Sequence, residues 1–438
     1  MKRVIFVLLF VVLLLVFLAA CTITGKYADE QDIVQEAEKQ VMIYENSKPT
    51  EIYFCPRDDC ADKLVNLVSS ANKSVHCALF DLDLQDLIEA FDGKSNEIDV
   101  RVVVDNENEK GLEDYDWIRF DDTSQLSHNK FCVIDNNIVS TGSFNPTERC
   151  AYYNNNNFEI IYSEYLAKNY EAEFQELWQG NFGEGGGVEY SHIILNSNDY
   201  YNYFCPEDDC AEHVKEFIKK ANDSIKFMTF SFTDHSIAID IAARMSNNVS
   251  VQGIFESRRG EYSEDEFLDL QGADIRLDNN KYNLHHKVFI IDDKWVVFGS
   301  YNPTGSGDDK NDENIIITND ESVVSRFLEE FEYVWSFEWP EIEEIESDKS
   351  AVYISEVMYD PEGSDKGNEY VELFNPADET ANVNGYRLMN EKDTKVIFGE
   401  IEPNSSLKIT DIFTLKNSNS SIALFDRNLE QMDYVKWG

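Results

Sequence analysis

The stretches HNKFCVID at residues 128–135 and HHKVFIID at residues 285–292 decide the fold of this chain. Both have the pattern H-x-K-x4-D, and both are followed by G-S-x-N, with Gly142 and Gly299 seven residues after the aspartate. A pattern this short still arises by chance only about 0.1 times in a chain of this composition. Two matches, each followed by the same second motif, therefore indicate an internal duplication that carries chemistry.

The duplication extends outward from these motifs. Tyr-Phe-Cys-Pro occurs at 53–56 and again at 203–206. In each copy a strand, an amphipathic helix, a second strand, a second helix and a β-rich run follow one another, and a helix with aromatic residues on one face closes the copy. Alternating strands and helices predict an α/β fold of two similar lobes. The predicted lobes are residues 50–182 and 188–340.

The rest of the chain differs in composition from the lobes. A glycine-rich linker at 183–187 separates them, and residues 22–49 hold one modest helical stretch that we interpret as a tether. Residues 341–350 form an acidic linker. Residues 351–438 contain short strands separated by turn residues and no helical period, which predicts a small β-sandwich.

The charge of the chain is strongly negative. Its 438 residues include 37 basic and 84 acidic side chains, so the formal net charge is −47. This charge argues against broad electrostatic adhesion to polyanions, and any phosphate binding must come from a local cationic pocket. Hydrophobic residues make up 42% of the chain, which is enough for folded cores.

The N-terminus has the pattern of an export signal. Lys2 and Arg3 precede an apolar run at 4–20, which ends in Leu-Ala-Ala before Cys21. The small residues before Cys21 resemble a lipobox, in which the cysteine is lipid-modified after cleavage, so residues 1–21 are interpreted as a signal segment. An uncleaved membrane anchor is the alternative. Both predict an exported protein held by its N-terminus on the extracytoplasmic face of a membrane.

The cysteines follow the duplication. The element C-P-x-D-D-C occurs twice, and outside the cell such short pairs are expected to be disulfides. The expected pairs are Cys55 with Cys60 and Cys205 with Cys210. A zinc site is the weaker reading, because no third or fourth ligand is repeated nearby. Cys77 and Cys132 lie in apolar runs and are expected to be core residues, and Cys150 is left unassigned.

The motif residues predict phosphate chemistry. His and Lys two positions apart on a strand point to the same face, so each motif sets a nitrogen nucleophile or acid beside a fixed cation. Two facing half-sites would clamp one phosphate between two histidines and two lysines, with G-S-x-N donating hydrogen bonds to its oxygens. No metal or other cofactor is needed for this chemistry. The residues are His128, Lys130, His285 and Lys287, with Ser143, Asn145, Ser300 and Asn302 binding the phosphate.

The carboxylates near the motifs are assigned to other roles. Asp135 and Asp292 lie an odd number of residues from the histidines, so we expect them on the opposite face as scaffold residues that bond the following turn. Glu159 and Glu313 end Asn-Phe-Glu and Asn-Asp-Glu segments that occupy matching places in the two copies. We expect each to orient a histidine through its far ring nitrogen; an exposed acid at a strand start is the alternative.

Residues 50–340 resemble the phospholipase D superfamily, whose mark is this duplicated HKD motif. The resemblance implies two α/β lobes about a pseudo-two-fold axis, with one active site at their seam. It also implies a covalent phosphohistidine that water resolves, with His128 as nucleophile and His285 as general acid. Its catalytic motif comprises His128, Lys130, Asp135, His285, Lys287 and Asp292.

Residues 351–438 resemble a lamin tail domain. The resemblance rests on ISEVMY at 354–359, EYVELFN at 369–375 and NGYRL at 384–388. It implies an immunoglobulin-like β-sandwich that contributes binding or spacing.

The substrate stays open between two phosphodiester classes. The superfamily includes phospholipases, nucleases, lipid synthases and transferases, and compact lobes resemble its small nuclease branch. The tether favours bilayer lipid, but no amphipathic basic helix for docking on a membrane is present. We therefore expect a nuclease, with a phospholipase D acting on phospholipid head groups as the alternative. A surface binding protein that acts through the lamin tail domain is the non-enzyme alternative, and no protein partner is predicted.

Overall fold

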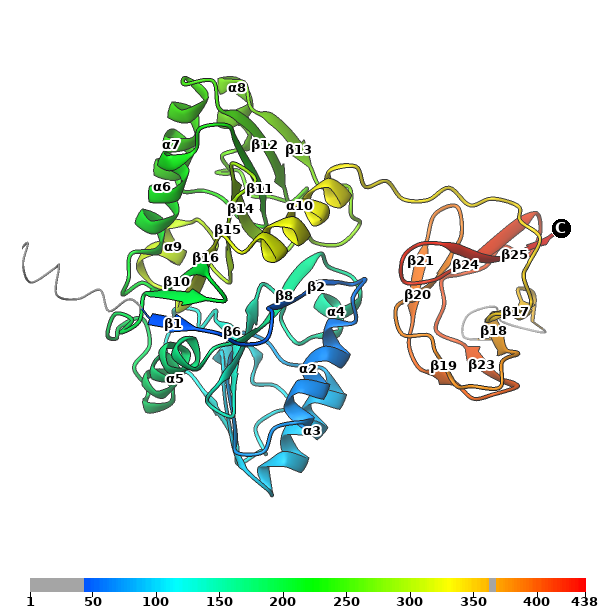
Figure 1. The fold of residues 1–438 in the computed structure, drawn as a ribbon. Helices are drawn as coiled ribbons and strands as arrows, with labels where there is room; N and C mark the ends of the chain where they lie inside the picture. Colours follow the sequence, from blue (N-terminus) through cyan, green and yellow to red (C-terminus); the bar gives the residue numbers. More distant parts are fainter. Residues whose placement is uncertain (1–42, 362–367) are drawn as a thin grey trace, which may run out of the picture.

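The computed structural model describes residues 43–361 and 368–438. The expected signal segment 1–21, the lipidation of Cys21 and most of the predicted tether lie outside the described residues. Within the described ranges, none of the helices is both long and apolar enough to span a bilayer. The described chain forms two α/β lobes followed by a β domain (Figure 1).

The first lobe is built on a seven-stranded sheet of order β2-β8-β7-β6-β3-β4-β5. Helices α2 and α3 cover its outer face, and α5 lies on the face toward the second lobe (Figure 1). The strands are β2 (Glu51–Cys55), β3 (Ser74–Leu79), β4 (Asp99–Val104), β5 (Ile118–Phe120), β6 (Lys130–Ile134), β7 (Ile138–Gly142) and β8 (Asn156–Tyr162). The helices are α2 (Cys60–Ser69), α3 (Gln85–Ser95), the 3-10 helix η1 (Asn106–Asn108), α4 (Glu148–Tyr152) and α5 (Glu164–Gln179).

The second lobe repeats this sheet and adds two strands, in the order β1-β9-β10-β16-β15-β14-β11-β12-β13. The strands are β1 (Ile43–Glu45), β9 (His192–Leu195), β10 (Asn198–Cys205), β11 (Ser224–Thr229), β12 (Ser250–Phe255), β13 (Asp274–Leu277), β14 (Lys287–Ile291), β15 (Trp295–Gly299) and β16 (Glu313–Thr318). The helices are α6 (Cys210–Lys220), α7 (His235–Met245), α8 (Asp265–Gln271), α9 (Gly305–Asp309) and α10 (Glu321–Trp335). The predicted fold of two similar lobes is confirmed.

The prediction of a tether over residues 22–49 is wrong near the C-terminal end of that range. Residues 43–45 form β1, which pairs in parallel with β9 of the second lobe and so joins a sheet. Ile43 packs on the core between the lobes, and Glu45 accepts a hydrogen bond from the backbone N–H of Glu164 at the start of α5. Burial of one apolar side chain and this contact explain why the segment is ordered here.

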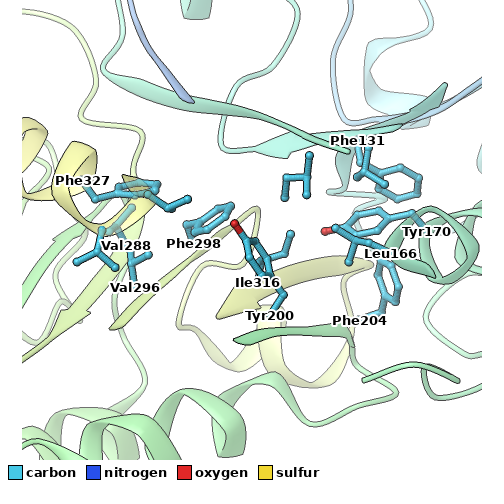
Figure 2. Close-up of a cluster of buried hydrophobic side chains, with 14 of the residues drawn as sticks. Phe131, Leu166, Tyr170, Tyr200, Phe204, Val288, Val296, Phe298, Ile316 and Phe327 are labelled. Carbon is cyan, nitrogen blue, oxygen red and sulfur yellow. The ribbon is translucent and has the colours of Figure 1, made fainter. Parts of the chain in front are cut away.

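The largest core lies between the lobes and draws on both. Figure 2 shows Phe131 and Tyr170 of the first lobe facing Phe204 of the second. The Tyr170 and Phe204 rings are 4.9 Å apart at their centroids, and Phe54 meets Phe327 across the same interface at 5.4 Å. Each fully buried aromatic side chain contributes about 2 kcal/mol through the area it removes from water. The two lobes therefore share one core and hold their seam in a fixed geometry.

The long helices that close each lobe begin at polar caps. The Ser163 hydroxyl accepts from the N–H of Leu166 at the start of α5, and the Asp320 carboxylate accepts from the N–H of Ser322 at the start of α10. Such caps satisfy N–H groups that have no partner within the helix. The apolar faces of both helices are buried in the core between the lobes, as their aromatic spacing predicts.

The structure contains three disulfides within the described ranges. Cys55 is bonded to Cys60 and Cys205 to Cys210, so both predicted pairs are present. Cys77 and Cys132 are buried core residues, as predicted, but they also form a third disulfide that the sequence did not indicate. They lie directly opposite each other in the antiparallel pairing of β3 with β6, a proximity that only the sheet register reveals.

The C-terminal β domain contains a three-stranded, a two-stranded and a four-stranded sheet. It packs on the first lobe at α4, where Tyr152 contacts Phe398 and the Arg387 guanidinium donates to the Tyr152 carbonyl at 3.1 Å. Arg427 forms an ion pair with Asp59 beside this contact. The strands are β17 (Tyr353–Met358), β18 (Tyr370–Asn375), β19 (Ala381–Asn382), β20 (Tyr386–Met389), β21 (Thr394–Ile397), β22 (Glu400–Ile401), β23 (Ser405–Ile409), β24 (Ser420–Phe425) and β25 (Gln431–Trp437).

Candidate active site

The two motif strands are the central pair of the site. Strands β6 and β14 begin at Lys130 and Lys287, and every residue of both strands is buried. In each lobe the lysine turns back onto its own histidine, with Nζ donating to the carbonyl of His128 at 2.6 Å and to that of His285 at 2.8 Å. Histidine and lysine of each motif therefore share one face, as the i, i+2 spacing predicts.

Two short parallel bridges join the lobes where the histidines lie. Ser127 of the first lobe pairs with Asp312 of the second, and Asn155 pairs with Leu284. Each bridge falls one residue before a motif histidine, so the two histidines enter the seam side by side with 6% and 7% of their surfaces exposed. An aromatic ring flanks each of them, because Phe80 contacts His128 and Phe230 contacts His285.

The carboxylate that faces His128 comes from the other lobe. Nδ1 of His128 lies 2.7 Å from Oε2 of Glu313, which is fully buried at the start of β16. A hydrogen bond from Nδ1–H to this carboxylate leaves Nε2 with its lone pair toward the seam. Glu313 therefore contacts a motif histidine in the way expected of an orienting acid.

Glu159 does not take the equivalent place, and its expected role is wrong. Among the described contacts, its carboxylate accepts from the side-chain amide of Asn157 and meets no histidine. His285 instead points Nδ1 at the Asn156 side-chain oxygen, 2.8 Å away, and at the Ser143 carbonyl, 3.0 Å away.

The strand registers explain this difference. Cys55 lies opposite Asn156 in the first lobe, and the equivalent Cys205 lies opposite Glu313 in the second. Asn156 is thus the structural counterpart of Glu313, three residues before Glu159. The sequence could have shown this equivalence, because Asn156 lies 28 residues after His128 and Glu313 lies 28 residues after His285.

The G-S-x-N turns are shaped by their glycines. Gly142 has φ +128°, and a Cβ there would lie 2.5 Å from the Asn157 carbonyl oxygen; at Gly299, with φ +152°, it would lie 2.2 Å from the Asn314 carbonyl oxygen. Only glycine fits where the turn passes so close to the neighbouring strand.

The serines that follow bond the neighbouring strands through their hydroxyls. Ser143 Oγ donates to the Asn157 side chain and accepts from its backbone N–H, and Ser300 Oγ accepts from the backbone N–H of Asn314. Their hydroxyls therefore hold the turn to β8 and β16. The side-chain oxygens of Asn145 and Asn302 are buried without a hydrogen-bond partner in the described chain, so these asparagines are the better candidates for contacting a substrate.

The motif aspartates are scaffold residues, as expected. The segment that they bind is not the following turn that the sequence predicted. The Asp135 carboxylate accepts from the backbone N–H groups of Asn72, Lys73 and Ser74, before β3. Asp292 holds the equivalent segment before β11 through three N–H groups, the shortest at 2.7 Å. Both therefore bind the segment that leads into a central strand rather than the turn that follows them.

Sequence reasoning missed two buried acids that position the motifs. Asp105 accepts from the backbone N–H of Ser127, and Glu256 accepts from that of Leu284, each at the residue just before a motif histidine. Both acids directly follow the apolar strands β4 and β12. A polar residue at the carboxyl end of a buried strand is a recognised signal for a site and could have identified them.

Burial and clustered cations control protonation in the seam. Burial lowers the pKa of Lys130 to about 8 and lowers that of Lys287 well below its ordinary value. The pKa values of both histidines are also lowered well below the usual range, by burial first and then by the two lysines. Burial raises the pKa of Glu313 to about 8, against the opposing effect of Lys130. A bound phosphate anion would raise the pKa values of the two lysines and of His285 and so favour their charged forms.

Comparison with known proteins assigns the family. The family described as "Cardiolipin synthase, PLD-like domain" matches residues 64–178 and 214–335, which together are more than half of the chain. The chain belongs to the phospholipase D superfamily. It is accordingly a phosphodiesterase, and residues 346–438 match the Lamin Tail Domain, which confirms the resemblance of the C-terminal domain.

Curated relatives in this superfamily carry several names. The chain is 28% identical over 142 residues to a phospholipase D of Rickettsia prowazekii (strain Madrid E), covering 32% of this chain and 69% of that protein. It is 41% identical over 64 residues to the mitochondrial cardiolipin hydrolase of Homo sapiens, covering 15% of this chain and 25% of that protein.

Two solved structures extend the comparison. The phospholipase D family member Nuc from Salmonella typhimurium is 28% identical, with a TM-score of 0.30, and the match covers 32% of this chain and 94% of that chain. Phosphatidylserine synthase from Haemophilus influenzae Rd KW20 is 13% identical with a TM-score of 0.51 and covers 65% of this chain and 86% of that chain. The second likeness extends over both lobes and concerns the fold.

Proposed function

We propose that this phosphodiesterase is an exported, membrane-tethered nuclease that works through a phosphohistidine on His128. In the first step Nε2 of His128 attacks phosphorus, and the bond from phosphorus to the leaving oxygen breaks. His285 donates a proton from Nε2 to that oxygen. Lys130 and Lys287 neutralise the phosphoryl oxygens, and Glu313 accepts from Nδ1–H of His128 and so stabilises the charge that develops on its ring.

In the second step water attacks the phosphohistidine. Neutral His285 takes the proton from water, the new oxygen bonds to phosphorus, and the bond from phosphorus to Nε2 breaks. The electron pair returns to His128, and His285 is again protonated for the next cycle. Each histidine thus ends in the state in which it began.

One observation carries the choice of nucleic acid: cations and aromatic rings gather around the segment that leads into His285. Arg258 donates to the Lys281 carbonyl, Lys281 lies over the Trp339 ring at 4.5 Å, and Tyr282 contacts Tyr153 at 4.7 Å. Bases stack on aromatic side chains, and Lys and Arg attract the backbone. Arg258 also pairs with Glu256, so the cation that this group offers to a substrate backbone is Lys281.

The export part of the proposal rests on the N-terminal pattern together with the cysteines. The apolar run at 4–20 before Cys21 has the pattern of a lipoprotein signal, and three disulfides in the described chain suit an oxidising compartment. Globomycin-type blockade of lipoprotein processing would leave a longer precursor in whole cells. A mature N-terminus upstream of Cys21 would remove this part of the proposal.

A phospholipid head group is the second candidate substrate. Relatives named phospholipase D and cardiolipin hydrolase favour it. The loop after β4 also favours it, because this loop carries the acids Glu107, Glu109, Glu113 and Asp114 on the first lobe, where a polyanion meets repulsion and a cationic head group does not.

The test compares both substrates on one preparation. The full chain in detergent is given single-stranded DNA, double-stranded DNA, RNA, and vesicles of phosphatidylcholine or cardiolipin, with His128→Ala as the blank. We expect cleavage of single-stranded nucleic acid at least tenfold above any lipid hydrolysis. Lipid hydrolysis without nucleic-acid cleavage would replace the proposal by the second candidate.

A further inference from the structure

The acceptor behind His285 is an amide where the other lobe has a carboxylate. Asn156 Oδ1 lies 2.8 Å from Nδ1 of His285, whereas Glu313 Oε2 lies 2.7 Å from Nδ1 of His128. Both residues begin equivalent strands, β8 and β16, and both reach a histidine of the opposite lobe. The remaining acceptor on His285 is the Ser143 carbonyl, which is also neutral.

The surroundings of Asn156 select an amide. Its Nδ2 donates to the Cys150 carbonyl at 3.0 Å and to the Asn154 carbonyl at 3.1 Å. These two bonds fix which end of the amide faces His285, because only the NH2 end can donate to carbonyls. A carboxylate in this position would direct an oxygen at two carbonyl oxygens. The amide is therefore built into the site, with Asn156 wholly buried.

The charged groups that act on His285 from the packed elements disfavour its cation. Lys287 lies on its own strand, Lys130 lies on β6 and His128 precedes β6, and all three oppose protonation of His285. Glu313, the carboxylate of the seam, is engaged by His128. The Cys150 thiol of α4 lies close enough to both lysines to affect them. A neutral acceptor at Nδ1 adds no opposing charge.

We propose that Asn156 is a positioning residue that sets the upper pH limit of turnover, by leaving the His285 imidazolium without a carboxylate partner. This proposal rests on His285 acting as the proton donor of the proposed mechanism, and on no particular substrate. A donor without a carboxylate gives up its proton readily to the leaving oxygen and also loses it to solvent at a lower pH. The activity is thereby confined to neutral and acidic conditions.

The test is the pH profile of kcat/KM for full-length protein and its Asn156→Asp variant. Bis(p-nitrophenyl) phosphate reports the integrity of the phosphodiesterase centre, since its leaving group needs no proton, and an alkyl p-nitrophenyl phosphodiester cleaved at the alkyl oxygen reports proton donation. We expect the descending limb with the alkyl leaving group to move at least one pH unit upward in the variant. The ascending limb, which belongs to His128, stays in place.

The mirror variant supplies the matched control. Glu313→Gln removes the carboxylate that contacts His128. It should therefore move the ascending limb of the profile to lower pH and leave the descending limb unmoved. A descending limb that stays fixed in folded Asn156→Asp, or an equal shift of both limbs, overturns the proposal. Hydrolysis of bis(p-nitrophenyl) phosphate without nucleic-acid cleavage would count against the nuclease and leave this inference standing.

The native protein gives an independent reading if the variant does not fold. The descending limb of the native profile is expected below about pH 7, near or under the ordinary histidine value. A native limb above about pH 8 would show a donor as well stabilised as one paired with a carboxylate, and would overturn the proposal.

Discussion

Behind the motif histidines, the two lobes use different polar groups in equivalent places. In the first lobe Asn129 follows the histidine, and it contacts Glu173 and Asn314. In the second lobe His286 follows the histidine, and it contacts Glu330 and Asn157. The pattern of contacts is retained, but an amide in one lobe has become an imidazole in the other.

The charges behind these groups differ as well. Arg57 forms an ion pair with Glu330, whereas the equivalent place in the second C-P-x-D-D-C element is Glu207. Burial, followed by the nearby Glu207, raises the pKa of Glu173 well above its ordinary value. The duplicated motif thus preserves the groups that meet the phosphate, while the two supporting networks have become chemically distinct.

The largest effects are expected when each motif histidine is replaced by alanine in turn. His128→Ala should lower turnover more than a thousandfold with every substrate, since the nucleophile is lost. His285→Ala should cost about 10²–10⁴-fold with leaving groups that need a proton and much less with p-nitrophenolate. Initial rates on matched phosphodiesters measure both effects.

Acid quenching locates the intermediate directly. With substrates whose leaving group needs no proton, a phospho-adduct on His128 should persist in His285→Ala, because the base that activates water is missing. An adduct found on His285 in the native protein would reverse the two roles.

The central strands of the lobes differ in how they are joined. Cys77 and Cys132 are bonded across β3 and β6, whereas the equivalent pair across β11 and β14 is Phe227 and Phe289. Replacing Cys77 and Cys132 by serine should lower the free energy of unfolding by about 4 kcal/mol, against about 2 kcal/mol for Cys55 and Cys60, because the bridged loop is longer. Urea unfolding of both double variants, followed by tryptophan fluorescence, provides the comparison. Equal losses would contradict the loop-length argument.

Two buried glutamates, Glu159 inside β8 and Glu313 at the start of β16, distinguish the register of the structure from the one expected from sequence. Glu313→Gln should lower turnover about 100-fold, which corresponds to about 2.7 kcal/mol of transition-state stabilisation. Glu159→Gln should change turnover less than fivefold, because its carboxyl contacts Asn157 and not a histidine. A larger loss in Glu159→Gln than in Glu313→Gln would restore the original expectation.

The motif aspartates should affect stability and leave the chemistry nearly intact. Partial burial raises the pKa of Asp292, but bonds from the N–H groups of Ser224, Asp223 and Asn222 outweigh it, so the pKa lies below its ordinary value. Asp292→Asn should lower the free energy of unfolding by about 1–2 kcal/mol. Because the folded pKa is depressed, the contribution is present above the unfolded value near pH 4 and disappears as the pH falls further. Urea midpoints at pH 7 and pH 3 test this, and an unchanged difference between native and variant at both pH values contradicts it.

The smallest expected effect is that of a chelator. The lysine pair and the two histidines provide the charge and proton transfer that the proposed steps require, so excess EDTA should change turnover less than twofold. Loss of activity in EDTA that Mg²⁺ or Zn²⁺ restores would show that one lobe supplies a metal ligand.

Sequence reasoning succeeded where local periodicity was sufficient. The i, i+2 spacing of His128 and Lys130 placed both on one face, and the odd spacing of Asp135 placed it elsewhere. It failed where the outcome depended on the register between strands. The disulfide of Cys77 follows from which residues lie opposite each other in β3 and β6, and no spacing within a single segment encodes that. Asn156 could have been found, because it lies 28 residues after His128, as Glu313 lies 28 residues after His285.

The exchange of acceptors across the seam has a consequence for how this chain can change over generations. A protein with one lobe could build such a seam only from two copies, and any substitution would then appear at both histidines together. Here the copies are covalently joined, and Asn156 and Glu313 are encoded separately. One histidine can therefore lose its carboxylate while the other retains it, so fusion permits a division of labour that identical halves cannot reach.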